Sequence, residues 1–218
     1  ISTVAACEVT PDHPSVGLSL SNLAGRYSAN GLYTQAEPLY VRALGIREKA
    51  LGPNHPDVAA TLTHLANLYS RLRKYVQAEP LYLRSLVIRE KSLGPDHLDV
   101  ATSLNNIAHL YVQTGQYAKA EPLYTRGLAI QEKVLGPDHP TVAGTLNDLA
   151  VLYLREDKYS QAEPLYIRAL AIREKAFGPD HRDVGVSLND YAIFFEKQGQ
   201  YAKAEPLYIR SLAISEKV

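Results

Sequence analysis

Hydrophobic residues recur along this chain at the spacing of paired amphipathic helices. Within residues 58–69 they fall at i, i+4, i+7, i+8 and i+11, which places them on one stripe of an α-helix. A second stripe follows over residues 78–93. No stretch alternates between apolar and polar residues as a half-buried strand does. The pattern therefore predicts an all-α chain built from helix pairs.

The same helix pair is predicted five times. The segment Ala-Glu-Pro-Leu-Tyr at 36–40 returns unchanged at 78–82, 120–124, 162–166 and 204–208, always 42 residues further on. An internal repeat of this length is typical of a solenoid. We expect the repeats to span residues 11–52, 53–94, 95–136, 137–178 and 179–218, with residues 1–10 forming the end of a preceding repeat.

Glycine, proline and polar residues mark the turns. The turn inside three units holds a glycine (Gly31, Gly115 and Gly199), which indicates a positive φ there, and Arg73 and Asp157 occupy that position in the other two. Leu-Gly-Pro at 51–53 reads as a helix stop. The residue after it (Asn54, Asp96 or Asp138) is the expected N-cap of the next helix. Pro38 and its equivalents are expected near the start of the second helix, where a missing N–H costs little.

The repeat resembles a known family. Leu65-Ala66, Tyr69, Ala78, Tyr82 and Ser85 follow the tetratricopeptide spacing of small and bulky residues, in a unit longer than the usual 34 residues. Three further segments resemble the kinesin light chain subclass: Leu-Gly-Pro-Asp-His-Pro at 135–140, Leu-Asn-Asn-Ile-Ala at 104–108 and Arg-Ala-Leu-Ala-Ile-Arg-Glu-Lys at 168–175. The resemblance implies a right-handed α-solenoid of five helix-turn-helix repeats, with the first helices lining a concave peptide-binding groove.

Composition narrows the classes of partner. The 218 residues include 23 basic and 23 acidic side chains, so the chain lacks the basic excess of nucleic-acid-binding proteins. It has no apolar run long enough to cross a membrane, and no secretory signal. The single cysteine rules out an intramolecular disulfide and fits a cytoplasmic location. We expect a protein or peptide partner, no nucleic acid and no membrane.

The ends suggest a piece of a longer protein. The chain starts at Ile1 rather than Met and stops in the frame of a second helix, before any capping helix. We expect Tyr208, Leu212 and Ile214 to form a partly exposed apolar end. Self-association through such repeat ends is a further expectation.

The residues that could carry chemistry are periodic, which favours structural roles. The five loop histidines lie one per unit, so they cannot converge on one metal ion, and we expect them to close loop hydrogen bonds. Fourteen tyrosines occupy three fixed positions and are expected in the core; Phe195 completes one of these sets, so no hydroxyl is required there. The fixed arginines (Arg42, Arg84, Arg126, Arg168 and Arg210) predict ion pairs between repeats. No phosphate loop, His-Glu-x-x-His or nucleophile elbow is present, so we expect no enzyme, metal or cofactor.

One face of the first helices differs from unit to unit. In the third unit it consists of Thr102, Asn106, His109 and Gln113, almost opposite the apolar stripe. Because packing between repeats fixes the frame, varying positions indicate a surface that meets something other than a neighbouring repeat. A solvated face would vary too, but solvent alone does not favour the apolar Val151 and Ile193 there. In kinesin light chains the second Asn of Leu-Asn-Asn-Leu-Ala lies in the cargo-peptide groove, which the resemblance carries over to Asn22 and Asn106.

We therefore predict a peptide-binding groove on the first helices. Its candidate residues are Asn22, His64, Asn67, Arg71, Asn105, Asn106, His109, Gln113, Asn147, Asp148, Val151, Arg155, Asn189, Asp190, Ile193 and Lys197. Units one to three offer neutral or basic groups, whereas units four and five add two carboxylates beside an apolar patch. The predicted function is a protein-interaction scaffold that binds an extended peptide. The alternative is a rigid structural, assembly or regulatory module of a larger protein.

Overall fold

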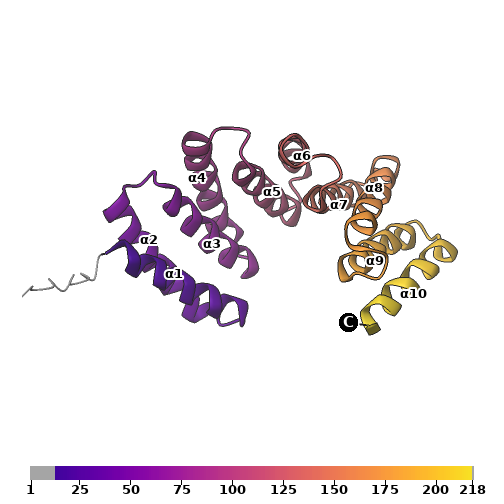
Figure 1. The fold of residues 1–218 in the computed structure, drawn as a ribbon, viewed down its shortest axis with the longest axis horizontal. Helices are drawn as coiled ribbons and strands as arrows, with labels where there is room; N and C mark the ends of the chain where they lie inside the picture. The colour runs from indigo at the N-terminus through magenta and orange to yellow at the C-terminus, as the bar shows by residue number, and fades with distance from the viewer. Residues whose placement is uncertain (1–12, 218) are drawn as a thin grey trace, which may run out of the picture. The chain divides into compact units, whose positions relative to one another are not determined.

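The computed structural model describes residues 13–217 and confirms the all-α class, with helix following helix (Figure 1). Ten helices and no strand occur within this range. The helices are α1 (Pro14–Ala29), α2 (Tyr33–Leu51), α3 (Pro56–Arg71), α4 (Tyr75–Leu93), α5 (Leu98–Gln113), α6 (Tyr117–Leu135), α7 (Pro140–Arg155), α8 (Tyr159–Phe177), α9 (Arg182–Lys197) and α10 (Tyr201–Lys217). The expectation that residues 1–10 end a preceding repeat lies outside the described residues.

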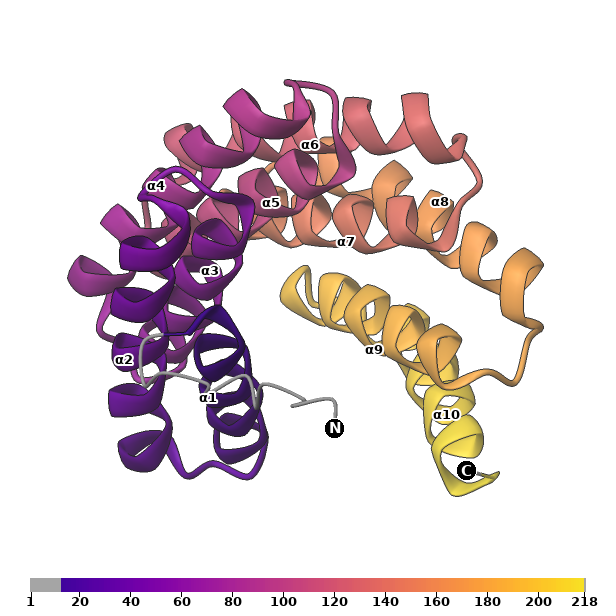
Figure 2. The same ribbon diagram turned by 60° about the vertical axis from the view of Figure 1, so that its left-hand side comes forward.

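The chain forms two compact units, which are described separately. The N-terminal unit contains α1–α4 and the C-terminal unit, from Asp96 onward, contains α5–α10. In both units the two helices of a pair pack along each other, as α9 and α10 do in Figure 2. Each second helix also packs against the next first helix within its unit: α2 on α3, α6 on α7 and α8 on α9.

The core repeats from pair to pair. In the N-terminal unit, Val58 and Leu62 of α3 are fully buried against Ile88 of α4, and Leu44 of the preceding α2 packs on the same cluster. Equivalent clusters join α6, α7 and α8 around Leu146, and α8, α9 and α10 around Leu188. The first helices α3, α7 and α9 are thus each held from two sides. Burying one such Val or Leu side chain stabilises the fold by about 1.5–3 kcal/mol.

The loop histidines cap the first helices, and the expected acidic caps were wrong. His55 precedes α3, and its Nδ1 accepts a hydrogen bond from the backbone N–H of Asp57 at 3.1 Å. The other four loop histidines accept from the residue two further on in the same way: His13, His97, His139 and His181. Asp96 and Asp138 instead bind Lys133 and Lys175 at 2.5 and 2.6 Å. An imidazole acceptor thus replaces the carboxylate that usually caps a helix.

The prolines lie deeper in the second helices than expected. Helix α2 begins at Tyr33, so Pro38 is its sixth residue and lies beyond the first turn. A proline there removes the N–H that would bond to the carbonyl of Thr34. Every second helix carries this interruption at the same place, and each runs through it without a break.

The predicted ion pairs between successive repeats are confirmed within each unit. Arg84 of α4 binds Glu48 of α2 at 2.5 Å. In the C-terminal unit, Arg168 binds Glu132 at 2.7 Å and Arg210 binds Glu174 at 2.6 Å. These pairs are partly exposed, so we expect each to contribute about 1 kcal/mol or less. Their main effect is to fix how one second helix lies beside the next.

A tyrosine hydroxyl adds a second link between repeats, contrary to the expectation that none is needed. Tyr69 and Tyr153 donate to glutamates of the preceding second helix, Glu37 and Glu121, at 3.0 and 2.9 Å. Phe195 occupies the equivalent position in the last pair and has no hydroxyl. There Tyr191, one helical turn earlier, donates to Glu163 at 3.2 Å. The hydroxyl is therefore supplied from a neighbouring position when the usual one lacks it.

The turn residues behave as predicted. Gly31, Gly115 and Gly199 have φ of 75°, 73° and 70°, and Arg73 and Asp157 share this left-handed conformation with φ of 57° and 58°. A side chain in that conformation brings its Cβ too close to the backbone carbonyl. The second and fourth turns are consequently strained relative to the glycine turns.

We expect Arg73→Gly to stabilise the protein. Glycine adopts this φ without a Cβ clash, and the gain exceeds its larger loss of backbone entropy by about 0.5 kcal/mol. Urea unfolding would measure the change. The reciprocal variant Gly115→Ala, whose added methyl would meet no atom within 4 Å, should lose about 1 kcal/mol through backbone strain alone. A stabilising Gly115→Ala would contradict this account of the turns.

Candidate functional site

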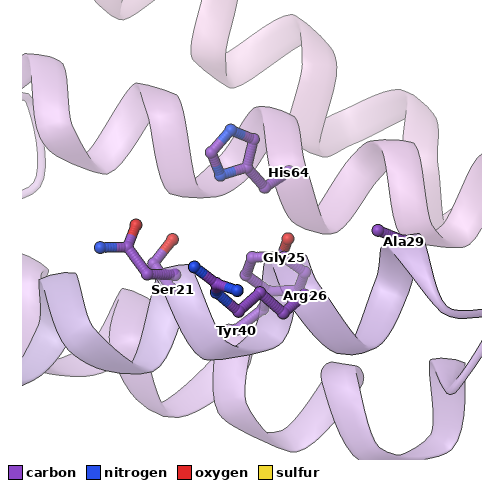
Figure 3. Close-up of a pocket in the computed structure, with 7 residues that line it drawn as sticks. Ser21, Gly25, Arg26, Ala29, Tyr40 and His64 are labelled. Atoms are coloured by element: carbon purple, nitrogen blue, oxygen red, sulfur yellow. The ribbon is translucent and has the colours of Figure 1, made fainter.

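The N-terminal unit has a hollow on the varying face of its first helices. It encloses about 610 Å³ between α1 and α3, with His64 on one side and Ser21, Gly25 and Arg26 on the other (Figure 3). The remaining lining residues are Asn22, Ala29 and Tyr40. The ring of His64 lies 5.8 Å from that of Tyr40. Two candidate residues, Asn22 and His64, therefore line this hollow.

The C-terminal unit has a smaller hollow on the equivalent face of α7 and α9. It encloses about 320 Å³ and is lined by Val151, Leu154, Arg155, Tyr166, Asp190, Ile193 and Lys197. Five of these seven are candidate residues. The lining combines four largely apolar side chains with one carboxylate and two cations. Such a hollow suits an apolar side chain that has charged groups beside it.

A tyrosine of the second helix forms the floor of both hollows. Tyr40 and Tyr166 occupy the same position in their repeats. They lie 126 residues apart (166 minus 40), which is three repeats, and both rings are buried. What lies above the hydroxyl depends on the residue 15 positions earlier. Gly25 leaves space above Tyr40, where an added Cβ would lie 3.5 Å from the hydroxyl. Asn67 closes the equivalent place in the second repeat by accepting from Tyr82 at 2.5 Å.

The hydroxyl of Tyr166 is buried without a partner. The residue 15 positions earlier is Val151, which cannot accept a hydrogen bond, and Tyr166 is 1% exposed. No group among residues 13–217 hydrogen-bonds to this oxygen. Its ring stacks on Tyr191 at 5.8 Å and lies 5.6 Å from Phe194. A buried unpaired hydroxyl of this kind costs free energy.

The two carboxylates of the C-terminal unit hold their charge less readily than usual. Surrounding protein atoms raise the pKa of Asp148 to about 6, although its side chain is partly exposed; Arg173 opposes the rise and Asp190 adds to it. Burial also raises the pKa of Asp190. Asn147 donates to the Asp190 carboxylate at 2.7 Å and partly offsets that rise. Asp190 is therefore held in place by its hydrogen bond from Asn147, whereas the side chain of Asp148 is exposed.

The two histidines of this face are less basic than usual. Burial, and then the charges of Arg47 and Arg89, lower the pKa of His64. Burial, and then Arg155, lower that of His109. Gln113 lies one turn from His109, with the Gln Nε2 and His Nε2 atoms 3.3 Å apart. The surroundings therefore favour the neutral form of both imidazoles.

Three of the candidate asparagines lie outside the two hollows. Asn105 is half-buried and donates to Thr145 of the next first helix at 2.7 Å, with its Oδ1 against the backbone of Gly127. Asn147 is buried and donates to Asp190. Asn189, the third member of this set, lines a hollow beside α10. Asn105 and Asn147 therefore link neighbouring first helices, and none of the three asparagines lines either of the two hollows described above.

The other candidates lie on the varying face without lining either hollow. Asn67 accepts from Tyr82, and Asp148, His109, Gln113 and Arg71 are exposed. Asn106 is half-buried.

Sequence reasoning missed the floor and part of the walls. Tyr40 and Tyr166 were placed only in the core, and Ser21, Arg26 and Leu154 were not selected. The sequence did hold a pointer to this tyrosine. The position of Tyr40 and Tyr166 is tyrosine in all five repeats, whereas the position of Tyr69 is phenylalanine, Phe195, in the last repeat. A hydroxyl kept in every unit indicates that the oxygen has a role besides packing.

Within residues 13–217, no group of three or more His, Cys, Asp or Glu side chains is placed to hold a metal ion. None of the ten helices is both long and apolar enough to cross a bilayer.

Five helix pairs with this packing define the α-solenoid class of repeat protein. The tetratricopeptide repeat family matches residues 15–90, 57–133, 99–174 and 141–217. The chain therefore belongs to the tetratricopeptide repeat family, and its 42-residue units are of the kinesin light chain type. No curated protein is similar enough in sequence to count as a match.

Solved structures of similar proteins agree with this assignment. BtubC (BKLC) from P. vanneervenii is 28% identical, with a TM-score of 0.80 over 94% of this chain and 81% of that protein. A kinesin light chain-like protein of Podosopora anserina with nearly identical TPR-like repeats is 29% identical, with a TM-score of 0.78 over 94% and 97%. YrrB, a TPR protein with an unusual peptide-binding site, is 15% identical with a TM-score of 0.53 over 91% and 86%, and shows the fold alone. Membership of the repeat family supports a role as a protein-interaction scaffold.

We expect the hydroxyls of Tyr82 and Tyr166 to affect stability in different ways. Tyr82→Phe removes the hydrogen bond to Asn67 and should cost about 1 kcal/mol. Tyr166→Phe removes a buried group that has no protein partner, so it should leave stability unchanged or raise it by up to about 1 kcal/mol. Thermal and urea unfolding of the two variants would measure this difference. Equal losses in both would show that the Tyr166 hydroxyl is already satisfied.

The raised pKa of Asp148 predicts a pH-dependent loss of stability. A carboxyl whose pKa is higher in the folded state contributes stability below its unfolded pKa of about 3.8 and loses that contribution as pH rises through about 6. Asp148→Asn should therefore stabilise the protein at about pH 7.5 and have little effect at about pH 4. We expect a gain of a few tenths to about 1 kcal/mol, since water screens this partly exposed side chain.

Asp138→Asn is the control, because the pKa of Asp138 is lowered whereas that of Asp148 is raised. A hydrogen bond and charge from Lys175 lower the pKa of Asp138, so its contribution is present at neutral pH and is lost as pH falls. Its replacement should not stabilise the protein at about pH 7.5. Urea unfolding at both pH values compares the two variants. A stabilising Asp138→Asn at neutral pH would mean that general charge repulsion, rather than the surroundings of Asp148, sets the effect.

Proposed function

We propose that this chain is a peptide-binding scaffold whose ligand lies on the varying face of the first helices. The observation that carries the proposal is the hollow of about 320 Å³ in the C-terminal unit. Its walls come from positions that differ between repeats, and its floor is a buried hydroxyl that lacks a protein partner. Positions that pack one helix on the next vary little, and where they change they do so in matched pairs, so these walls are better explained by a ligand than by packing.

The chemistry of this hollow selects the ligand. Val151, Leu154 and Ile193 favour an apolar side chain, and the Tyr166 hydroxyl favours one that carries a polar atom near its tip. Arg155 and Lys197 at the wall would attract an acidic group next to it. On the same face, Asp148 would attract a basic one once it is ionised. Opposite charges here would set orientation and association rate more than affinity.

The hollow of the N-terminal unit offers polar contacts. Asn22 can both donate and accept, so it can pair with the backbone of an extended peptide whatever its side chains are. Arg26 and the neutral His64 add a cation and a ring surface. Asn106 of α5 has the same amide chemistry in its own repeat. We infer that these positions hold the peptide backbone.

Charge reversal of exposed residues tests the proposal. A peptide library displayed on phage is selected against the purified chain, and the affinities of its acidic and basic binders are measured by fluorescence anisotropy. Lys197→Glu should weaken acidic binders by about threefold to tenfold, and Asp148→Lys should weaken basic binders by a similar factor at about pH 7.5. Asp190 is left intact because it accepts from Asn147.

Lys91→Glu provides the matched control. This exposed lysine lies near the end of α4 and lines neither hollow, and its reversal changes the net charge by the same amount as Lys197→Glu. Binders that lose affinity equally with Lys91→Glu and Lys197→Glu would respond only to overall charge. A library that yields no binder sensitive to either groove variant would leave the varying face without a ligand role.

A further inference from the structure

Two faces of the described chain expose positions that are buried in other repeats. Inside each unit, the leucine of one second helix packs on the next first helix: Leu44 on Val58 and Leu62, and Leu170 on Val184 and Leu188. These valines and leucines of the next first helix are fully buried. The equivalent positions on α10 and α1 are more exposed than these.

The face of α10 is uncovered at the positions that elsewhere meet the next repeat. Leu212 is equivalent to Leu44 and Leu170 but is 59% exposed, and Tyr208 is more exposed than the four tyrosines equivalent to it. A hollow of about 420 Å³ lies here, lined by Asn189, Tyr208, Ile209, Ser211, Leu212 and Ser215. This agrees with the expected exposed end at Tyr208 and Leu212. Ile214 was expected there too, but it is buried against α9.

The face of α1 is uncovered at the complementary positions. Val16 and Leu20 are equivalent to Val58 and Leu62, yet they are only half-buried. Leu23 is 42% exposed, whereas its equivalents Leu65 and Leu149 are buried. Together these residues form the surface on which a leucine of a preceding second helix packs in the other repeats. The chain therefore carries both halves of one interface.

The polar groups at the two faces match as well. Within the units, Glu48 binds Arg84 and Glu174 binds Arg210, each pair 36 residues apart. The glutamate of this series on α10 is Glu216, and the arginine on the second helix beside α1 is Arg42; both are exposed. Glu205 of α10 is equivalent to Glu37, and Tyr27 of α1 is equivalent to Tyr69, whose hydroxyl donates to Glu37. Charge and hydrogen-bonding groups are thus complementary across the two faces.

From this complementarity we propose that the α9–α10 face binds the α1 face of a second copy of the chain, head to tail. Leu212 packs on Val16 and Leu20 of the other copy, as Leu44 packs on Val58 and Leu62. Glu216 pairs with Arg42 of that copy. The contact is heterologous, so each copy keeps one free face of each kind and the association is open-ended.

The junction differs from internal ones at two polar positions. Lys74 binds Glu37 at 3.3 Å and Lys158 binds Glu121 at 3.7 Å, whereas the equivalent of these lysines in the first repeat is Leu32.

At the second position, a long side chain inside the units reaches a hydroxyl of the next first helix: Arg47 reaches Thr61 at 2.7 Å, and Gln131 accepts from Thr145 at 2.7 Å. The equivalent residues at the junction are Ser215 and Ser19, two short hydroxyls. The intermolecular contact therefore lacks both polar links and is weaker than the internal ones, which suits a reversible association.

Sedimentation of two blocked variants tests the proposal. Leu212→Glu blocks the α10 face and Leu23→Glu blocks the α1 face, and both side chains are exposed in the single copy. The wild-type chain should show an average mass that rises with concentration. Each variant alone should associate at least about tenfold more weakly, because the contact would bury an unpaired charge. An equimolar mixture should form a dimer and nothing larger.

The control and the contrary outcomes separate this contact from others. Val76→Glu, at a position that is 89% exposed and outside both faces, should associate like the wild type. A Leu23→Glu chain that still dimerises on its own would indicate a symmetric contact and overturn the proposal, as would a wild-type chain that stays monomeric at every concentration. If circular dichroism shows that Leu23→Glu is unfolded, Arg42→Glu replaces it as the α1-face variant, and its mixture with Glu216→Arg should associate more strongly than either alone.

Discussion

The first helices α3, α7 and α9 are each buried by two second helices, one from their own repeat and one from the repeat before. Val58 and Leu62 pack on Ile88 of their own pair and on Leu44 of the preceding pair. A single pair cannot bury this surface, so the stability of one repeat depends on its neighbours. The strict 42-residue period follows, because a shift of the frame in one unit would misplace the side chains of two.

The residues at contacts between helices also differ from repeat to repeat, and they change in matched pairs rather than singly. Phe195 has lost a hydroxyl that Tyr69 and Tyr153 use, and Tyr191 supplies it from the preceding turn. Asn105 packs against Gly127, where a methyl group would clash with its Oδ1. In the second repeat, the same two positions hold Thr63 and Ser85, whose hydroxyls bond at 2.8 Å. Neighbouring helices therefore share a fixed volume and a fixed set of hydrogen bonds, which different residue pairs can fill.

The sequence predicted the helix pairs, the strained turns at Arg73 and Asp157, and the ion pairs of Arg84, Arg168 and Arg210, because periodicity and residue type determine these locally. It did not predict the histidine caps, since the neighbouring Asp has the same capping chemistry and only the backbone geometry decides between them. The helical wheel separated the packed face from the varying face. It placed Asn105 and Asn147 with the varying face, although they lie at the boundary, where the partner helix decides which way an amide turns.

The tyrosine floor shows how a constant frame gives a variable site. The ring of this tyrosine belongs to the core in the first four repeats, so the residue cannot change without loss of packing. Its hydroxyl lies against the first helix of its own repeat, where the residue 15 positions earlier decides which group it meets. Gly25 leaves space beside the hydroxyl of Tyr40, Asn67 satisfies that of Tyr82, and Val151 leaves that of Tyr166 unpaired. A repeat protein of this kind can thus alter the polar groups on its first helices at one position per repeat while the tyrosine ring beneath stays in the core.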